Sequence, residues 1–214
     1  RNDNFMILTD VNIPFINKID INDECEFIQR YSKFDINDEL NIIIVCSGSD
    51  VSSSDAIISI LLMHKGTINI YIPSICYSGG TMIALCADNI FMNSYSLLTP
   101  VDPQIGFSEE DDDLLPCKYY VNLKKIKGLK KLSDETIIKY YECKDLYDDN
   151  IRNMKRILEG KYSSKIKNNI IKNFGRCVYP HSKPFNIDEL KKIGLEIKYP
   201  LPSYYQSIFN KFFL

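Results

Sequence analysis

The stretch that decides the fold covers residues 68–88 and reads INIYIPSICYSGGTMIALCAD. Its first part, residues 68–73, is a run rich in β-branched residues, which predicts a buried strand. The turn formers of Tyr77-Ser78-Gly79-Gly80 come next, and a helix is expected immediately after them, over 81–87. The segment therefore predicts a strand that passes through a tight turn into a helix.

The segments on either side continue this alternation. Residues 42–46 read IIIVC, which predicts a second buried strand, and turn formers follow at 47–50. A helix is expected over 53–64, with serine and aspartate side chains available to cap its start. A third short strand is expected at 90–92. The order strand, helix, strand, helix, strand predicts an α/β fold with a parallel core sheet built from βαβ units and flanking helices.

The C-terminal half is predicted to be mainly helical over 133–174, and Ser133 is expected to cap the first of these helices. A short helix over 187–193 and a final strand over 195–197 are expected to close the fold. Neither a linker nor an internal repeat is visible, so residues 1–214 are expected to form one domain.

Charge and composition exclude several classes of protein. The formal net charge is −2 and the one dense basic cluster, 124–131, is expected to be a solvated face, so no nucleic-acid partner is predicted. The acidic run at 108–113 is expected to be a flexible exposed loop. The seven cysteines contain no CxxC pair, so no metal site is predicted. Cys46, Cys76 and Cys86 are expected to pack as small apolar side chains, which favours unpaired thiols or a reducing compartment.

No run of about 18 apolar residues is present, so no segment of the chain is expected to span a membrane. The chain begins at Arg1 and not at Met, so we expect it to be a piece of a longer protein. Any targeting or anchoring segment would then lie before it.

Ser78 is the residue best placed for chemistry, because it stands on a tight turn at the start of a predicted helix. Free N–H groups at such a position stabilise an oxyanion, and the adjacent glycines allow a substrate carbonyl to approach. A serine at this position can instead cap the helix through its side chain. From the residues alone, a nucleophile and a structural cap are both open interpretations.

Two motifs at a defined spacing resemble a known family. Residues 72–88, with their Ser-Gly-Gly-Thr core, and residues 98–106, LTPVDPQIG, are similar to two signatures of the serine dehydrogenase proteinase family. This family belongs to the ClpP-like serine proteases, with signal peptide peptidase A as a more distant relative. The resemblance covers most of the chain, and the further similar segments are 13–15, 19–23, 134–138, 181–185, 189–190 and 194–195.

The resemblance implies a ClpP/crotonase-type fold and a cofactor-free serine peptidase, with Ser78 as the nucleophile that forms an acyl-enzyme. It also implies an oxyanion hole formed by the N–H of Gly79 and by the turn at Gly48 and Ser49. The chain departs from the family at this turn, since residues 45–49 read VCSGS where the family has His-Thr-Pro-Gly-Gly. A Cβ at Ser49 therefore stands where a close backbone approach or a positive φ is expected.

The sequence leaves the general base open. ClpP uses a histidine, but this chain, like its closer family, carries Val101-Asp102-Pro103 in the corresponding region. A lysine base would have to be buried and neutral near pH 7. The candidates are Lys144, Lys139, His181, His64 and Asp102.

Three functions are consistent with these residues. The first is a serine peptidase that acts on peptides or proteins, forms homo-oligomers and associates with a membrane through a segment outside this chain. The second is a ClpP-fold subunit with impaired catalysis and an assembly or scaffold role, in which the helix after Ser133 would form the interface. The third is a crotonase-like enzyme that acts on a thioester and binds coenzyme A, which the Ser78 turn and residues 98–106 fit poorly.

Overall fold

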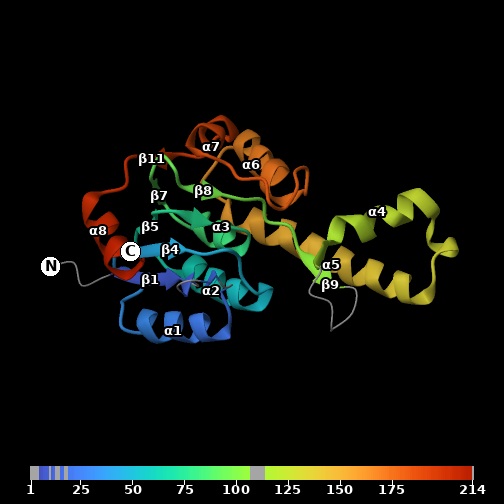
Figure 1. The fold of residues 1–214 in the computed structure, drawn as a ribbon, viewed down its shortest axis with the longest axis horizontal. Coiled ribbons are helices and arrows are strands. Elements are labelled where there is room, and N and C mark those ends of the chain that lie inside the picture. The colour runs from blue at the N-terminus through green and yellow to red at the C-terminus, as the bar shows by residue number, and fades with distance from the viewer. Residues whose placement is uncertain (1–4, 10, 13–14, 17–18, 107–113, 214) are drawn as a thin grey trace.

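The computed structural model describes the chain apart from residues 1–4, 10, 13–14, 17–18, 107–113 and 214 (Figure 1). The acidic run at 108–113 and the motif residues Ile13 and Pro14 therefore lie outside the described residues. The described segments form a mixed α/β structure in which helices pack on a parallel sheet (Figure 1).

The centre of the described structure is a five-stranded parallel sheet with the order β1-β4-β5-β7-β11. Its strands are β1 (Phe5–Thr9), β4 (Leu40–Val45), β5 (Ile68–Ile72), β7 (Asn89–Met92) and β11 (Ile197–Lys198). Parallel neighbours have to be joined by crossovers, and helices supply them here. The predicted parallel sheet of βαβ units with flanking helices is thus confirmed.

Successive residues of the central strands point to opposite faces of the sheet, and both faces are buried. On one face, Ile42 and Ile70 belong to the main core together with three helices, α1 (Ile21–Tyr31), α2 (Val51–Met63) and α3 (Gly79–Ala84). On the other face, Ile43 and Tyr71 pack against α8 (Ser203–Phe213) (Figure 1). Burial on both faces explains why β4 and β5 are apolar at all positions except Asn41 and Asn69. These two buried side chains are hydrogen-bonded to each other.

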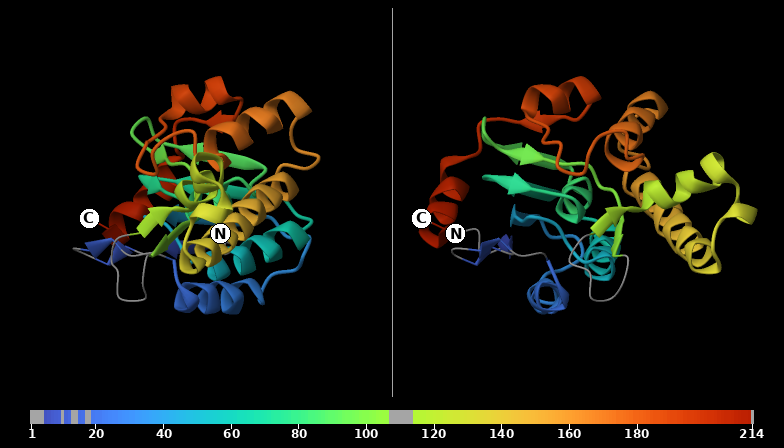
Figure 2. Two further views of the ribbon diagram at one scale, coloured as in Figure 1. Left: turned by 90° about the vertical axis from the view of Figure 1, so that its right-hand side faces the viewer. Right: turned by 45° about the vertical axis from the view of Figure 1, so that its right-hand side comes forward.

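The C-terminal half contains α4 (Cys117–Lys127), α5 (Asp134–Ile157), α6 (Ser164–Ile170) and α7 (Ile187–Ile193), with the short turns η1 (Leu129–Lys131) and η2 (Ile171–Gly175). Helix α4 packs along the first half of α5, and the two extend away from the sheet (Figure 1, Figure 2). Short strands pair outside the main sheet: β2 (Val11–Asn12) with β3 (Phe15–Ile16), β6 (Ile75–Cys76) with β8 (Leu97–Leu98), and β9 (Gln104–Gly106) with β10 (Leu114–Pro116).

Cap geometry confirms two of the predicted helix ends. Ser133 is the N-cap of α5, and its side chain accepts a hydrogen bond from the N–H of Thr136. Gly194 ends α7 with a φ of 112°, a conformation that glycine adopts without strain.

Other element boundaries differ from the expectation. The helix expected from residue 53 begins two residues earlier, after the N-cap Asp50. The hydroxyl of Ser54 does not cap this helix, since it donates to the carbonyls of Asp50 and Val51. Helix α3 begins at Gly79, directly after Ser78. Helix α1 was not predicted, although Asp20 and Asp23 form a capping box at its start.

Candidate active site

The turn that carries Ser78 connects strand β6 with helix α3. Ser78 is the N-cap residue of α3 and has a φ of 51° and a ψ of −118°. These angles are those of the first central residue of a type II′ turn, where glycine is the usual residue. A serine is held in this conformation only under strain, and such strain is concentrated at functional sites.

Hydrogen bonds from a distant segment hold the turn in place. The N–H of Ser78 donates to Thr99 Oγ1 over 2.9 Å. The N–H of Thr99 donates to Thr81 Oγ1 over 3.3 Å, and the hydroxyl of Thr81 donates to the carbonyl oxygen of Cys76 over 2.8 Å. Both threonines are buried, so this network fixes the Ser78 backbone from two sides.

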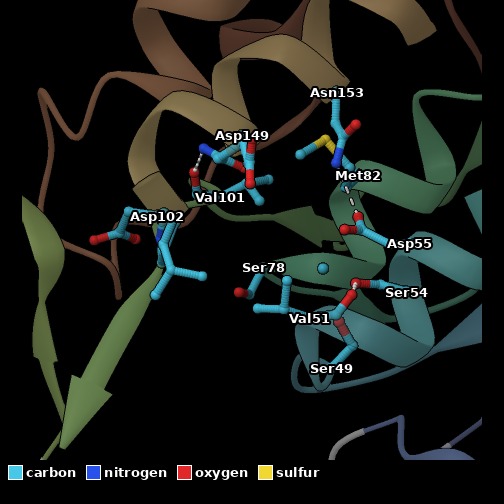
Figure 3. A pocket seen from close by; sticks show the side chains of 14 residues that line it. Ser49, Val51, Ser54, Asp55, Ser78, Met82, Val101, Asp102, Asp149 and Asn153 are labelled. Carbon is cyan, nitrogen blue, oxygen red and sulfur yellow. Dashed lines mark hydrogen bonds between the residues drawn. The ribbon is translucent and has the colours of Figure 1, made fainter. Parts of the chain in front are cut away.

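The side chain of Ser78 takes no part in this network. It makes no cap hydrogen bond to helix α3, so the interpretation of Ser78 as a capping serine is wrong. Ser78 is half-buried and lines a pocket, into which its side chain projects (Figure 3). Its hydroxyl is therefore available for chemistry.

The two glycines after Ser78 allow α3 to begin against the end of β4. A methyl group built on Gly80 would lie 2.1 Å from Cys46 Sγ, and one built on Gly79 would lie 1.7 Å from Ser49 Oγ. Neither position has room for a side chain. As the first residue of α3, Gly79 also has a backbone N–H without an acceptor inside the helix.

The turn at Gly48 and Ser49 lies beside Ser78, since a methyl group built on Gly48 would lie 3.6 Å from Ser78 Cβ. Ile19 pairs with it, because the N–H of Ile19 donates to the carbonyl of Gly48 over 2.9 Å and the N–H of Asp50 donates to the carbonyl of Ile19 over 2.8 Å. In such a parallel bridge, the residue between the two bonded positions directs its own N–H to the opposite side. The N–H of Ser49 therefore points away from Ile19, and Ser49 lines the same pocket as Ser78.

The expected conflict at Ser49 is not a conflict of backbone conformation. The positive φ, 150°, falls on Gly48, whereas Ser49 is not among the described residues with a positive φ. The close approach is real, since the Ser49 side chain packs directly against Gly79. Serine at this position thus fills space beside Gly79 without straining its own backbone.

The pocket around Ser78 has a volume of about 90 Å³ and lies between α2, α3, α5 and the turn at 101–103 (Figure 3). The structure brings Ser78, Gly79, Ser49 and Asp102 together in its lining. The other lining residues are Val51, Ser54, Asp55, Met82, Val101, Pro103, Leu146, Asp149, Asn150 and Asn153.

Helix α5 forms a wall of the pocket that the sequence analysis missed. Asn150 Nδ2 donates to the carbonyl of Val101 over 2.9 Å, and Asn153 Nδ2 donates to Asp55 Oδ1 over 3.0 Å. These contacts tie α5 to the 101–103 turn and to α2. The available signal was the spacing of the wall residues, Leu146, Asp149, Asn150 and Asn153, which share one face of a helix.

Two carboxylates, Asp55 of α2 and Asp149 of α5, lie on different walls of the pocket (Figure 3). Burial raises the pKa of Asp55 above its ordinary value of 3.8, and the negative charge of Asp149 raises it further. The positive charge of Arg156 and the hydrogen bond from Asn153 act in the opposite direction. The pocket beside Ser78 therefore disfavours negative charge at Asp55.

Two of the candidate bases, Asp102 and His181, form a pair between Asp102 Oδ1 and His181 Nδ1. The Asp102 side chain is 1% exposed, and its Oδ2 atom has no hydrogen-bond partner among the described residues. The carboxylate of Asp102 points away from Ser78 (Figure 3). The structure therefore joins these two candidates but does not bring their polar groups to the Ser78 hydroxyl.

Like His181, the remaining candidate bases are not among the residues that line the pocket. Lys144 is paired with Asp148 over 2.6 Å on the exposed side of α5, and this hydrogen bond raises the pKa of the lysine. A lysine base requires the opposite shift. Lys139 forms a similar ion pair with Glu142, and His64 is hydrogen-bonded at the far end of α2.

The cysteines near the site behave as small apolar residues, as expected. Cys46, Cys76 and Cys86 are at most 2% exposed, and burial raises the pKa of the Cys86 thiol to about 12. Within the described part of the chain, no group of three or more His, Cys, Asp or Glu residues could hold a metal ion. The same part of the chain contains no helix that is long and apolar enough to cross a membrane.

Comparison with known proteins identifies a family and two relatives that are similar to most of this chain. The profile of the ClpP-like SDH-type serine proteinase family matches residues 4–211. Uncharacterized protein MJ1495 of Methanocaldococcus jannaschii is 30% identical over 199 residues, which are 91% of this chain and 64% of the relative. Uncharacterized protein MJ0137 of the same organism is 27% identical over 190 residues, 89% of this chain and 64% of the relative. The chain thus spans 64% of the length of each of these relatives.

Proposed function

The chain belongs to the ClpP-like SDH-type serine proteinases and has the parallel-sheet α/β fold of that family, and from this premise we propose that it is a serine peptidase with Ser78 as its nucleophile. The observation that carries the proposal is the conformation of Ser78. A strained serine between a strand and a helix presents an uncommitted hydroxyl to a pocket. Nucleophilic serines are held on strand-to-helix turns of this kind in other hydrolases.

The proposed reaction is acyl transfer from a peptide bond. The Ser78 Oγ attacks the carbonyl carbon, the hydroxyl proton passes to a base, and the carbonyl oxygen becomes an oxyanion. The N–H groups of Gly79 and Ser49 are the proposed backbone donors to that oxyanion. Breakage of the C–N bond releases the amine with a proton, and water then hydrolyses the Ser78 ester.

The proposed proton acceptor is the pair of Asp102 and His181. This proposal is supported by the position of Asp102 in the pocket lining and by its contact with His181. Both side chains would have to turn towards Ser78, since the carboxylate is directed away from it (Figure 3). Catalytic hydrogen bonds are often formed only in the complex with substrate.

A second candidate function is that of a ClpP-fold subunit with impaired catalysis and an assembly role. One observation favours it: the described pocket lining contains neither a lysine nor a histidine. Self-association is proposed for either function, through the part of α4 and α5 that extends from the sheet. Exposed apolar side chains on these helices support it, with Ile126 73% and Ile138 60% exposed. Membrane association is proposed to come from a segment outside this chain.

The test is intact-mass spectrometry after incubation with a fluorophosphonate, for the natural chain and for Ser78→Ala. The expected result is one adduct on the natural chain and none on the variant. Both proteins should unfold at similar temperatures, because the Ser78 hydroxyl makes no cap bond. A folded natural chain that acquires no adduct at Ser78 contradicts the peptidase and leaves the assembly role.

A further inference from the structure

The side chain of Ser49 occupies the space directly beside Gly79. A methyl group built on Gly79 would come within 1.7 Å of Ser49 Oγ and 2.9 Å of Ser49 Cβ. The Ser49 hydroxyl is therefore packed against the backbone of the residue that follows Ser78. On the other side of the same turn, a methyl group built on Gly48 would lie 3.6 Å from Ser78 Cβ. Ser49 is thus held close to the reactive end of the pocket.

The Ser49 hydroxyl makes no hydrogen bond within the described part of the chain, although Ser49 is half-buried in the pocket lining. Its neighbour in the lining differs, since the hydroxyl of Ser54 donates to the backbone carbonyls of Asp50 and Val51. A hydroxyl group has one O–H donor, and it can donate a hydrogen bond to an acceptor group that enters the pocket. The Ser49 donor is therefore available to a bound group.

We propose that the Ser49 hydroxyl donates a hydrogen bond to the oxyanion that forms when Ser78 attacks a carbonyl group. This inference rests on the proposed peptidase function, because it concerns the same pocket. Its basis is the convergence of the Ser78 side chain, the Gly79 backbone and the Ser49 side chain at one place. Ser49 then supplies a side-chain donor in addition to its own backbone N–H.

The role of Ser49 in the reaction is that of a fixed donor. When the bond between Ser78 Oγ and the carbonyl carbon forms, the π electron pair moves to the carbonyl oxygen, and Ser49 donates to that oxygen. When the C–N bond breaks, the pair returns and the carbonyl is restored. Ser49 keeps its proton throughout, so the step consumes no co-reactant. A hydrogen bond that becomes stronger only as negative charge develops on the oxygen lowers the activation barrier. It does not tighten the binding of the substrate in its ground state.

The test is the rate of fluorophosphonate labelling at Ser78, followed by intact mass, in the variants Ser49→Ala, Ser49→Gly and Ser49→Thr. Labelling forms a bond from Ser78 Oγ to phosphorus and expels fluoride, while the serine proton is released to the base. The phosphonyl oxygen takes the place of the oxyanion. The matched control is Ser52→Ala, an exposed serine on the first turn of α2 that does not line the pocket.

The expected result is a loss of about 10²-fold in labelling rate for Ser49→Ala and Ser49→Gly, because each removes one oxyanion donor. Ser49→Thr keeps the hydroxyl and should retain most of the rate, and Ser52→Ala should match the natural chain. With an activated ester as substrate, Ser49→Ala should lower kcat and leave KM unchanged. Thermal unfolding of Ser49→Ala should match that of the natural chain, because no internal hydrogen bond is lost.

Two results overturn the inference while the peptidase proposal stands. Equal labelling of Ser49→Ala and the natural chain means that the hydroxyl is not a donor. Faster labelling of Ser49→Gly means that the side chain obstructs the oxyanion position. A natural chain that is not labelled at Ser78 overturns the peptidase proposal, and the inference with it.

Discussion

Thr99 Oγ1 accepts the N–H of Ser78 over 2.9 Å, although the two residues are 21 positions apart. Ser78 belongs to the turn before α3, and Thr99 follows strand β8. The hydrogen bond therefore links the two sequence motifs that first indicated the family. It also places the turn at 101–103 on one side of the pocket and Ser78 on the other.

Thr99→Val should impair both stability and labelling of Ser78. Valine has a similar shape but leaves the N–H of Ser78 without its acceptor, and such a loss costs about 1–3 kcal/mol. Urea unfolding would measure the loss, and the fluorophosphonate rate would show whether the turn has moved. Thr99→Ser keeps the acceptor and should behave like the natural chain in both measurements. Equal unfolding of Thr99→Val and Thr99→Ser would mean that this hydrogen bond does not hold the turn.

The strands and the Ser78 turn could be predicted because their causes are local. Burial on both faces makes a strand mostly apolar, so residues 42–46 and 68–73 indicate β4 and β5 to within two residues of their observed ends. Ser133 likewise marked the start of α5, because a cap acts within one helical turn.

The pocket could not be predicted in full because its contacts join residues far apart in the sequence. Asp102 and His181 are separated by 79 positions, and no local pattern indicates that they touch. The contact between Asn153 and Asp55 spans 98 positions. Lys144 is a candidate base from the sequence, but in the structure it pairs with Asp148 on the exposed side of α5.

Ser78→Gly should raise stability while it abolishes labelling. Glycine adopts the φ of 51° without the strain that serine suffers, and the serine side chain makes no cap hydrogen bond that would be lost. Relief of such strain is worth about 1 kcal/mol. Chemical denaturation would compare the free energies of unfolding of Ser78→Gly and Ser78→Ala. Alanine is the control because it removes the hydroxyl but keeps the backbone strain. If the alanine variant is as stable as the glycine variant, the turn is not strained.

Asp55→Asn should change the pH dependence of stability. The pKa of Asp55 is raised above 3.8, chiefly by burial, so the folded state holds this proton more tightly than the unfolded chain. The resulting stabilisation is complete below about pH 3.8 and is lost as the pH rises through the raised pKa. At neutral pH the charged side chain therefore opposes folding. Asparagine removes the charge and keeps an oxygen to accept from Asn153.

The measurement for Asp55→Asn is the urea midpoint at several pH values. The variant should be more stable than the natural chain at pH 7, and the difference should disappear near pH 3. Asp149→Asn provides a comparison, because removal of this neighbouring charge should lower the pKa of Asp55. If Asp55→Asn is less stable than the natural chain at pH 7, the interactions of Asp55 with Asn153 and Arg156 stabilise its charge by more than burial destabilises it.

His181→Ala should destabilise the fold more than Asp102→Asn does. The first change leaves a buried carboxylate without its partner, whereas the second removes the charge itself. The loss for His181→Ala is expected to be about 1–3 kcal/mol, because its side chain is partly exposed and water replaces part of the contact. Unfolding of both variants and of the double variant would measure the coupling. Additive losses would mean that the pair contributes nothing to stability.

Gly79→Ala should destabilise the fold through one identifiable clash. The added methyl group would lie 1.7 Å from Ser49 Oγ, and overpacking of this kind costs about 1–3 kcal/mol. Combination with Ser49→Gly removes that obstacle, and the next neighbour, Ser54 Cβ, would then lie at an ordinary 3.5 Å. Gly79→Ala should therefore destabilise the Ser49→Gly background much less than it destabilises the natural chain.

Gly80→Ala is the matched control for this rescue. Its methyl group would lie 2.1 Å from Cys46 Sγ and has no contact with Ser49, so Ser49→Gly should not rescue it. Urea unfolding of the single and double variants would give a double-mutant cycle with Ser49→Gly for each of the two alanine substitutions. A rescue confined to Gly79→Ala would establish that Ser49 fills the space beside Gly79 in solution, which is the placement that an oxyanion donor requires. Rescue of both variants, or of neither, would mean that the Ser49 side chain lies elsewhere.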